Sequence, residues 1–118
     1  MLKIRTKQLQ EFERANDNQF EDRVVAFLQD EFDDARTEPL PRLKPAVHDQ
    51  IGRARRYGFT SEQQLATYVT CAWLLGQDFD IEFPAAKEML SSPYSPDDKA
   101  TWLAQWTEAM FLALEEQY

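Results

Sequence analysis

The sequence is poor in residues that many enzymes and all disulfide-bonded folds need. Its 118 residues include one cysteine (Cys71), one histidine (His48) and three glycines. A single cysteine excludes an intramolecular disulfide framework and is typical of a reducing compartment. A single histidine leaves Ser–His, Cys–His and multi-histidine metal sites without their parts. We therefore expect no catalytic residue, no cofactor and no metal site, and the few glycines favour helices over an all-β chain.

Long apolar runs are also missing. No stretch approaches the roughly 20 apolar residues that span a bilayer, and the opening residues, MLKIRTKQLQEFER, lack the apolar segment of a secretory signal peptide. Hydrophobic residues still make up 43% of the chain and aromatic residues 13%, which is enough for a packed core. These features predict one cytoplasmic helical domain over residues 1–118 without a membrane partner.

Positive charge is scarce in the second half of the chain. Residues 1–59 contain 11 Lys/Arg and 11 Asp/Glu, whereas residues 60–118 contain ten acids against Lys87 and Lys99. This excess accounts for the net charge of −8 and repels phosphate backbones, so no nucleic-acid partner is expected. Two interpretations stay open. The acidic surface either steers a basic protein partner or only keeps the chain soluble.

A small basic cluster stands apart from this excess. It consists of Arg53, Arg55 and Arg56, with Lys44. At the end of a predicted helix, the arginines interact favourably with the helix dipole. Without an aromatic platform or a wider basic stripe, the cluster does not indicate nucleic-acid binding.

Apolar spacing is helical along most of the sequence, which predicts an all-α fold of about five helices. Thr6 is suited to cap a first helix. The clearest amphipathic stripe consists of Phe20, Val24, Phe27 and Leu28. Pro39 and Pro41 interrupt the pattern, and we expect the next helix to begin after Pro45.

Local signals delimit a central helix. Gly58 suits the left-handed position that follows a helix end, and Phe59 stands where an apolar residue packs back onto that helix. Thr60 and Gln63 match the capping-box pattern that opens the next helix. Residues 61–75 are apolar on most sides, so we expect this helix at the centre of an irregular bundle.

An acidic corner follows Gly76, which is expected to end the central helix. Residues 78–83 alternate polar and apolar side chains, and with no strand partner evident they predict an extended corner. Their three acids imitate the start of a calcium-binding EF-hand loop. Phe83 stands where that loop requires glycine, so a calcium site is not expected.

The last predicted helix, capped by Ser95, carries more large apolar side chains than one helix of a small domain normally buries. We predict a partner-binding face formed by Trp102, Trp106, Met110 and Phe111, with Glu108 and Glu115 at its rim. The alternative, in which Trp102 and Trp106 pack in the core, stays open at this point.

Four segments carry a family resemblance: IRTKQLQEF, FEDRVVAFLQDEF, RARRYGFTSEQQLATYV and LLGQDFD. The matching positions are Phe20, Arg23, Tyr57, Gly58, Glu62, Leu75, Gly76, Phe79 and Asp80. This pattern resembles small bacterial proteins encoded beside type VI secretion effector genes, near the spike and its PAAR tip. We assign a structural role to Tyr57, Gly58, Thr60, Gly76, Phe79 and Asp80. The chain departs from the pattern at Phe59, where the group has an aliphatic residue, and after Asp80, where it has tryptophan.

The resemblance implies a non-enzymatic accessory protein, an adaptor or co-chaperone, that binds a secreted effector or a spike component. Two other interpretations stay open. The chain could be an immunity protein whose acidic side chains cover the basic cleft of a cognate toxin. It could also be a structural helical module that assembles as a homo-oligomer.

Overall fold

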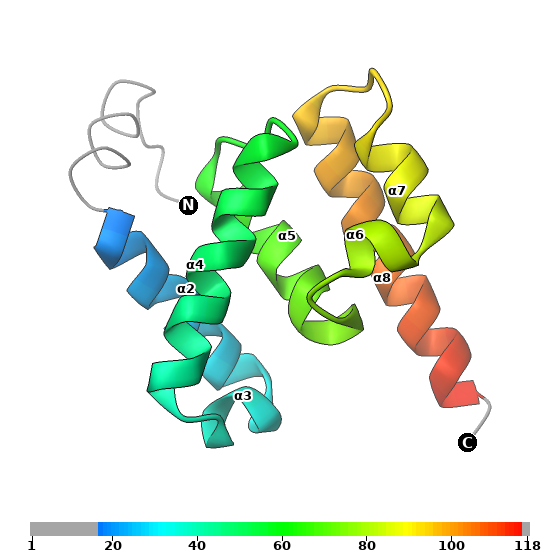
Figure 1. Cartoon of the computed structure of the whole chain (residues 1–118). Coiled ribbons are helices and arrows are strands. Elements are labelled where there is room, and N and C mark those ends of the chain that lie inside the picture. The colour runs from blue at the N-terminus through cyan, green and yellow to red at the C-terminus, as the bar shows by residue number, and fades with distance from the viewer. Residues whose placement is uncertain (1–16, 117–118) are drawn as a thin grey trace, which may run out of the picture. The chain divides into compact units, whose positions relative to one another are not determined.

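The computed structural model describes the backbone of residues 17–116 and the side chains of residues 19–113. This part of the chain is all-α and contains no strand, as the sequence predicts. In chain order the helices are α2 (Asp17–Glu31), α3 (Asp33–Thr37), α4 (Leu40–Arg56), α5 (Glu62–Leu75), α6 (Phe79–Glu82), α7 (Pro84–Leu90) and α8 (Pro96–Glu116) (Figure 1). The helix predicted near Thr6 lies outside the described residues. No helix within residues 17–116 has the length and apolarity needed to cross a membrane.

The chain divides into two compact units, Met1–Val47 and His48–Tyr118, and the boundary falls within α4. Each unit is described separately below. That the whole chain folds as one domain stays a prediction.

In the first unit, α2 buries one side of its helix. Phe20, Val24 and Leu28 are buried as predicted. Phe27 is wrong as a core residue, because it is 44% exposed while Val25 is buried. The i, i+4, i+8 series drifts by about 40° per step round a helix, so the buried side moves toward Val25 and away from Phe27.

A side chain from α3 completes the end of α2. The Arg36 guanidinium donates hydrogen bonds to the carbonyl oxygens of Gln29 (3.1 Å) and Asp30 (3.4 Å), and it also contacts Asp33. The last carbonyl groups of a helix lack intrahelical partners, and a cation there interacts favourably with the dipole. The turn between α2 and α3 is therefore closed by one arginine.

The start of α4 corrects the prediction from sequence. The helix begins at Leu40, before Pro45, and Pro45 lies inside it. Pro41 stands in the first turn, where a missing N–H group costs nothing. Burial of Leu43 explains why the helix begins early, since this side chain is 1% exposed.

The second unit opens with the end of α4. Gly58 has φ = +96°, its N–H donates to Arg55 O (3.0 Å), and Phe59 N–H donates to Ala54 O (3.1 Å). These two bonds form a Schellman motif. Phe59 is fully buried, so the predicted glycine stop and the apolar residue after it are both confirmed.

The capping box of α5 lies one residue later than predicted. Ser61, rather than Thr60, is the N-cap: its Oγ accepts from Gln64 N–H (3.1 Å), and Gln64 Oε1 accepts from Ser61 N–H (3.2 Å). Thr60 N–H donates to the same Gln64 oxygen (2.9 Å). The Thr60–Gln63 assignment is therefore wrong, although a capping box does open this helix.

Helix α5 packs mainly on α8, and the two run in the same direction (Figure 1). Gln64 near the start of α5 hydrogen-bonds Asp97 near the start of α8, and Cys71 farther along contacts Leu103 and Thr107. The buried residues of α5 are Gln64, Leu65, Tyr68, Val69, Cys71 and Ala72. Gly76 caps its C-terminus with φ = +116°, as predicted.

Residues 78–83 correct a second prediction, because they are not an extended corner. Phe79–Glu82 forms the short helix α6, and Glu82 N–H donates to Asp78 O (2.9 Å). Phe79 is fully buried whereas Ile81 is 62% exposed. The alternating pattern therefore does not mark the two faces of a strand.

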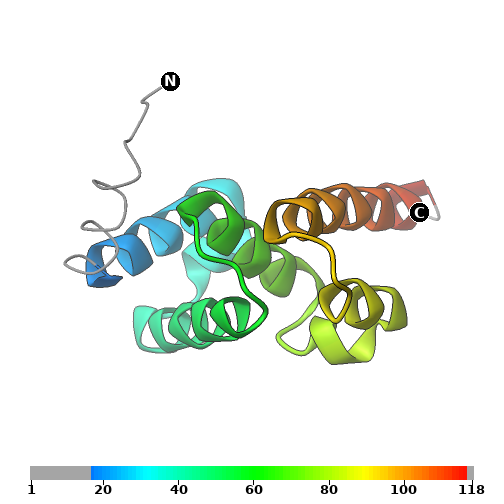
Figure 2. The same cartoon turned by 90° about the horizontal axis from the view of Figure 1, so that it is seen from above.

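The α6–α7 segment returns the chain to the start of α8. Figures 1 and 2 both show α7 beside α8. The Lys99 ammonium is buried and donates to Leu90 O at the end of α7 (2.9 Å). Ser95 caps α8, since its Oγ accepts from Asp98 N–H (3.1 Å).

The glycines of α4 and its C-terminus provide a matched test. A Cβ at Gly58 meets only Pro96 Cγ at 3.7 Å, and a Cβ at Gly52 meets nothing within 4 Å. Gly58→Ala should lower the free energy of unfolding by about 1–2 kcal/mol, because φ stays positive. Gly52→Ala should raise it by about 0.5–1 kcal/mol, because alanine is favoured inside a helix. Urea unfolding measures both, and equal effects would contradict the assigned helix end.

Candidate functional site

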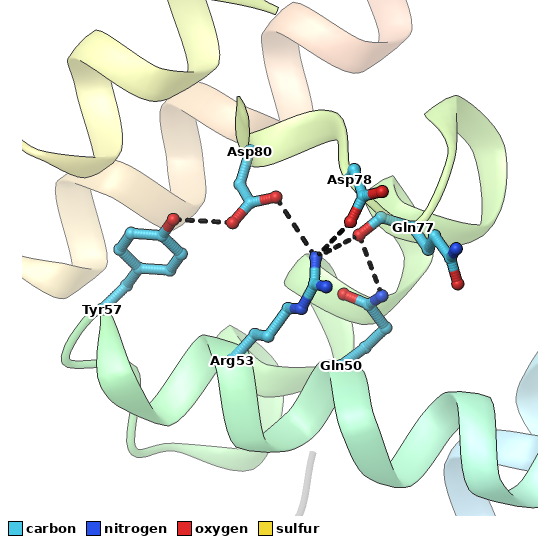
Figure 3. A network of polar contacts seen from close by, with 6 residues as sticks. All are labelled: Gln50, Arg53, Tyr57, Gln77, Asp78 and Asp80. Carbon is cyan, nitrogen blue, oxygen red and sulfur yellow. Dashed lines mark hydrogen bonds and ion pairs between the residues drawn. The ribbon is translucent and has the colours of Figure 1, made fainter. Parts of the chain in front are cut away.

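A buried carboxylate joins the end of α4 to α6 (Figure 3). Asp80 is 4% exposed, and it accepts a hydrogen bond from Tyr57 Oη (2.6 Å). Arg53 Nη1 lies 3.5 Å from Asp80 Oδ1 and 2.9 Å from Asp78 Oδ1. A buried charge is tolerated only when it is paired and hydrogen-bonded. Helix α4 and Tyr57, the residue that follows it, supply both partners.

The same arginine also satisfies the backbone that leaves α5. The carbonyl oxygen of Gln77 accepts from Arg53 Nη1 (2.7 Å) and from Gln50 Nε2 (3.0 Å) (Figure 3). Gln77 directly follows the glycine that ends α5. Two side chains of α4 therefore fix the path of the chain between α5 and α6.

Aromatic rings continue this cluster into the core. Tyr68 on α5 lies 6.0 Å from Tyr57, 5.9 Å from Phe59 and 5.0 Å from Phe79, measured between ring centroids. Ring pairs at these distances stabilise a core beyond their buried area. The motif residues Tyr57, Phe79 and Asp80, singled out from sequence, thus meet in one place.

The pKa values in this cluster are shifted away from the neutral range in which acid–base catalysis operates. Burial, followed by the hydrogen bond to Asp80, raises the pKa of Tyr57 to about 12. Burial also raises the pKa of Tyr68, with Asp80 adding to the effect. The hydrogen bond to Asp78 raises the pKa of Arg53. Groups that exchange protons in catalysis have pKa values near the working pH, so Tyr57 and Arg53 act here as fixed hydrogen-bond partners.

The aromatic residues predicted to bind a partner form a half-buried cluster. The rings of Trp102 and Trp106 on α8 stack with centroids 5.1 Å apart and planes inclined by 14°. Phe83, between α6 and α7, meets Trp106 edge-on at 5.4 Å. Leu103 and Thr107 of the same helix are buried. The core lies under those two residues, and the tryptophan pair lies at its margin, partly open to solvent.

The other predicted partner-binding residues are distributed differently. Met110 and Phe111 are half-buried, and Glu108 is exposed. Glu108 follows Trp106 by two residues, roughly 200° round the helix axis, so it lies away from the tryptophan pair. Asp98 stands one turn before Trp102 and shares its side of the helix. The side chain of Glu115 lies outside the described residues.

An open groove of about 450 Å³ lies between α5 and α8. Gln63 and Thr67 line it from α5, and Thr101 and Gln105 line it from α8. Asp97 at one end accepts a hydrogen bond from Gln64. The groove contains no nucleophile–base pair. Among the described residues, no cluster of His, Cys, Asp and Glu is placed to hold a metal ion.

The single cysteine is buried between α5 and α8. Cys71 Sγ accepts a hydrogen bond from Thr107 Oγ1 (3.1 Å). Burial raises the pKa of the thiol from 9.0 to about 11, and the Thr107 hydrogen bond opposes this shift. Reactive cysteines are exposed and have lowered pKa values, so the environment of Cys71 is that of a packing residue.

Comparisons with protein-family models, with curated proteins and with solved structures found no match. The resemblance to accessory proteins of type VI secretion therefore stays a prediction from the residues quoted above.

Substitutions of two arginines distinguish the contribution of the Asp80 cluster from the general effect of positive charge at the end of α4. Arg53→Gln should lower the free energy of unfolding by about 1–2 kcal/mol, because Asp80 keeps its burial and loses a charged partner. Arg56→Gln removes the same charge from an exposed side chain that bonds to no other described residue. Its effect should stay within about 0.5 kcal/mol. Equal losses in urea unfolding would show that only the dipole matters.

The raised pKa of Cys71 predicts a loss of stability at alkaline pH. The contribution of the buried thiol to the free energy of unfolding is fully present below pH 9, the ordinary thiol pKa. It is lost as the pH rises through about 11. Between these values wild type should lose roughly 2 kcal/mol relative to Cys71→Ser, whose hydroxyl does not titrate there. Denaturant unfolding at pH 8, 9, 10 and 11 measures the difference, and parallel curves for the two proteins would contradict burial of the thiol.

Proposed function

We propose that the chain is a non-enzymatic accessory protein of a bacterial type VI secretion system that binds an effector or a spike component. The single observation that carries a binding role is the stacked Trp102–Trp106 pair, partly open to solvent on α8. Tryptophan is enriched at the energetic centres of protein interfaces. The secretion context rests on the sequence resemblance alone.

The chemistry of the Asp80 cluster supports a binding role over catalysis. Tyr57 and Arg53 are committed to Asp80 and to the backbone of Gln77. Phe83 directly follows α6, the helix that carries Asp80, and its ring contacts Trp106. We therefore assign the cluster to holding the aromatic face in shape.

The charge of residues 79–116 favours a basic partner. In residues 79–116, eight acids stand against Lys87 and Lys99. Lys99 is buried against Leu90 O, which leaves Lys87 as the only exposed cation of this segment. Such a surface accelerates encounter with a positively charged partner.

The test is affinity capture from the native cells with a tagged chain, in high salt, followed by mass spectrometry. Wild type should retain an effector or spike component, and Trp106→Glu should lose it with its circular dichroism spectrum unchanged. Leu112→Glu is the matched control, because Leu112 is 54% exposed on another side of α8. Loss of helicity in Trp106→Glu would place that residue in the core, and Trp102→Glu then replaces it in the assay.

The outcome of deleting the gene separates the possible roles. An accessory protein's effector should become insoluble without it, whereas an immunity protein's toxin should kill the cell that makes it. Recovery of the bait alone, at a multiple of 13.8 kDa, would favour the homo-oligomeric module and overturn the proposal.

A further inference from the structure

The Trp102–Trp106 pair retains groups that are available to a partner. Trp102 and Trp106 stack on each other, and Phe83 covers one edge. Neither indole N–H group donates to another described residue. Both rings are half-buried, so part of each is reachable from solvent. An accessible indole face is the best side-chain surface for a cation, because the ring quadrupole is negative there.

Two exposed acids lie close to this pair along the chain. Asp98 is exposed one helical turn before Trp102 and therefore neighbours it on α8. Glu82 is exposed and directly precedes Phe83, the residue that contacts Trp106. Lys87 and the buried Lys99 are the only cations in residues 79–116. A cation over the rings would therefore meet a locally acidic surface.

We propose that the partner presents an amphipathic helix whose arginine stacks on the Trp102–Trp106 pair between Asp98 and Glu82. This inference rests on the function proposed above and names the chemistry of the partner. Arginine fits better than lysine, because its planar guanidinium stacks on aromatic rings while donating to carboxylates. A helix fits better than a strand, because the surface is the side of a helix and the described residues offer no sheet edge.

The probe is a set of three synthetic helical peptides that share one leucine stripe. One carries arginine at a central position, the second lysine, and the third citrulline, which has the shape of arginine without its charge. Binding to the full chain is followed by the indole N–H signals in ¹H–¹⁵N NMR spectra. The arginine peptide should shift the Trp102 and Trp106 signals. It should bind about tenfold more tightly than the citrulline peptide and about threefold more tightly than the lysine peptide.

Substitutions in the chain locate the binding site of the peptide. Trp102→Leu removes the aromatic ring but keeps an apolar side chain. Asp98→Asn removes the charge but keeps the shape of the side chain. Each variant should weaken arginine-peptide binding about fivefold or more. Glu108→Gln removes the same charge from the other side of α8 and should bind as wild type does. Equal affinities for arginine and lysine peptides, or equal losses in Asp98→Asn and Glu108→Gln, would mean general attraction to an acidic protein and would overturn the inference.

The peptide experiment and the capture experiment can give opposite results. An effector captured through Trp106, together with equal binding of arginine and citrulline peptides, would sustain the proposed function and refute the arginine contact. Arginine-specific binding with no effector captured would sustain the contact and refute the secretion role. A pure chain that dimerises through Trp102 would show that a second copy covers the face, and would overturn the inference.

Discussion

The pairing of the buried Asp80 carboxylate is the interaction on which the second unit depends. An unpaired carboxylate at 4% exposure would be costly, so Asp80 stays inside only while Tyr57 and Arg53 hold it. Helix α6 has four residues, too few to be stable through its own hydrogen bonds. Buried Phe79 and paired Asp80 therefore keep it folded. Because α6 leads directly to Phe83, this carboxylate also lies close in the chain to the ring that contacts Trp106 on α8.

Much of the fold follows from local rules that sequence reveals. The glycine stops at Gly58 and Gly76 and the Ser95 cap depend on residues within one turn, so their prediction from sequence was confirmed. The capping box of α5 shows the limit of such rules, because Thr60–Gln63 and Ser61–Gln64 fit the pattern equally well. The structure selects the second pair, and its Gln64 also bonds Asp97, 33 residues away. Contacts across that separation leave no mark in the local pattern.

The candidate site was predicted in part for the same reason. Spacing along α8 placed Trp102 and Trp106 on one side of a helix, and the structure brings them into contact. Whether they belonged to the core or the surface depended on Phe83, which is distant in sequence, and the answer is the margin between the two. Arg53 was interpreted as a charge at a helix end, although its partners Asp78 and Asp80 lie 25 and 27 residues away. The sequence shows which charges lie close together along the chain, but it does not show which distant charges pair in the fold.

The two accessible surfaces of α8 differ in what a partner would gain from them. The groove beside α5 presents Gln63, Thr67, Thr101 and Gln105. Covering it removes water from amide and hydroxyl groups, of which only the Thr67 hydroxyl already donates a hydrogen bond within the described chain, to Gln63 O. Covering the tryptophan pair removes apolar surface from water at about 25 cal/mol per Å². The only polar atoms of the two rings are indole N–H groups, which the described chain leaves unbonded. Asp98 and Glu82 remain solvated, so they raise the rate of encounter without a large desolvation cost. A partner would therefore gain most of its binding free energy on the tryptophan side of α8, and the acidic surface would favour basic partners.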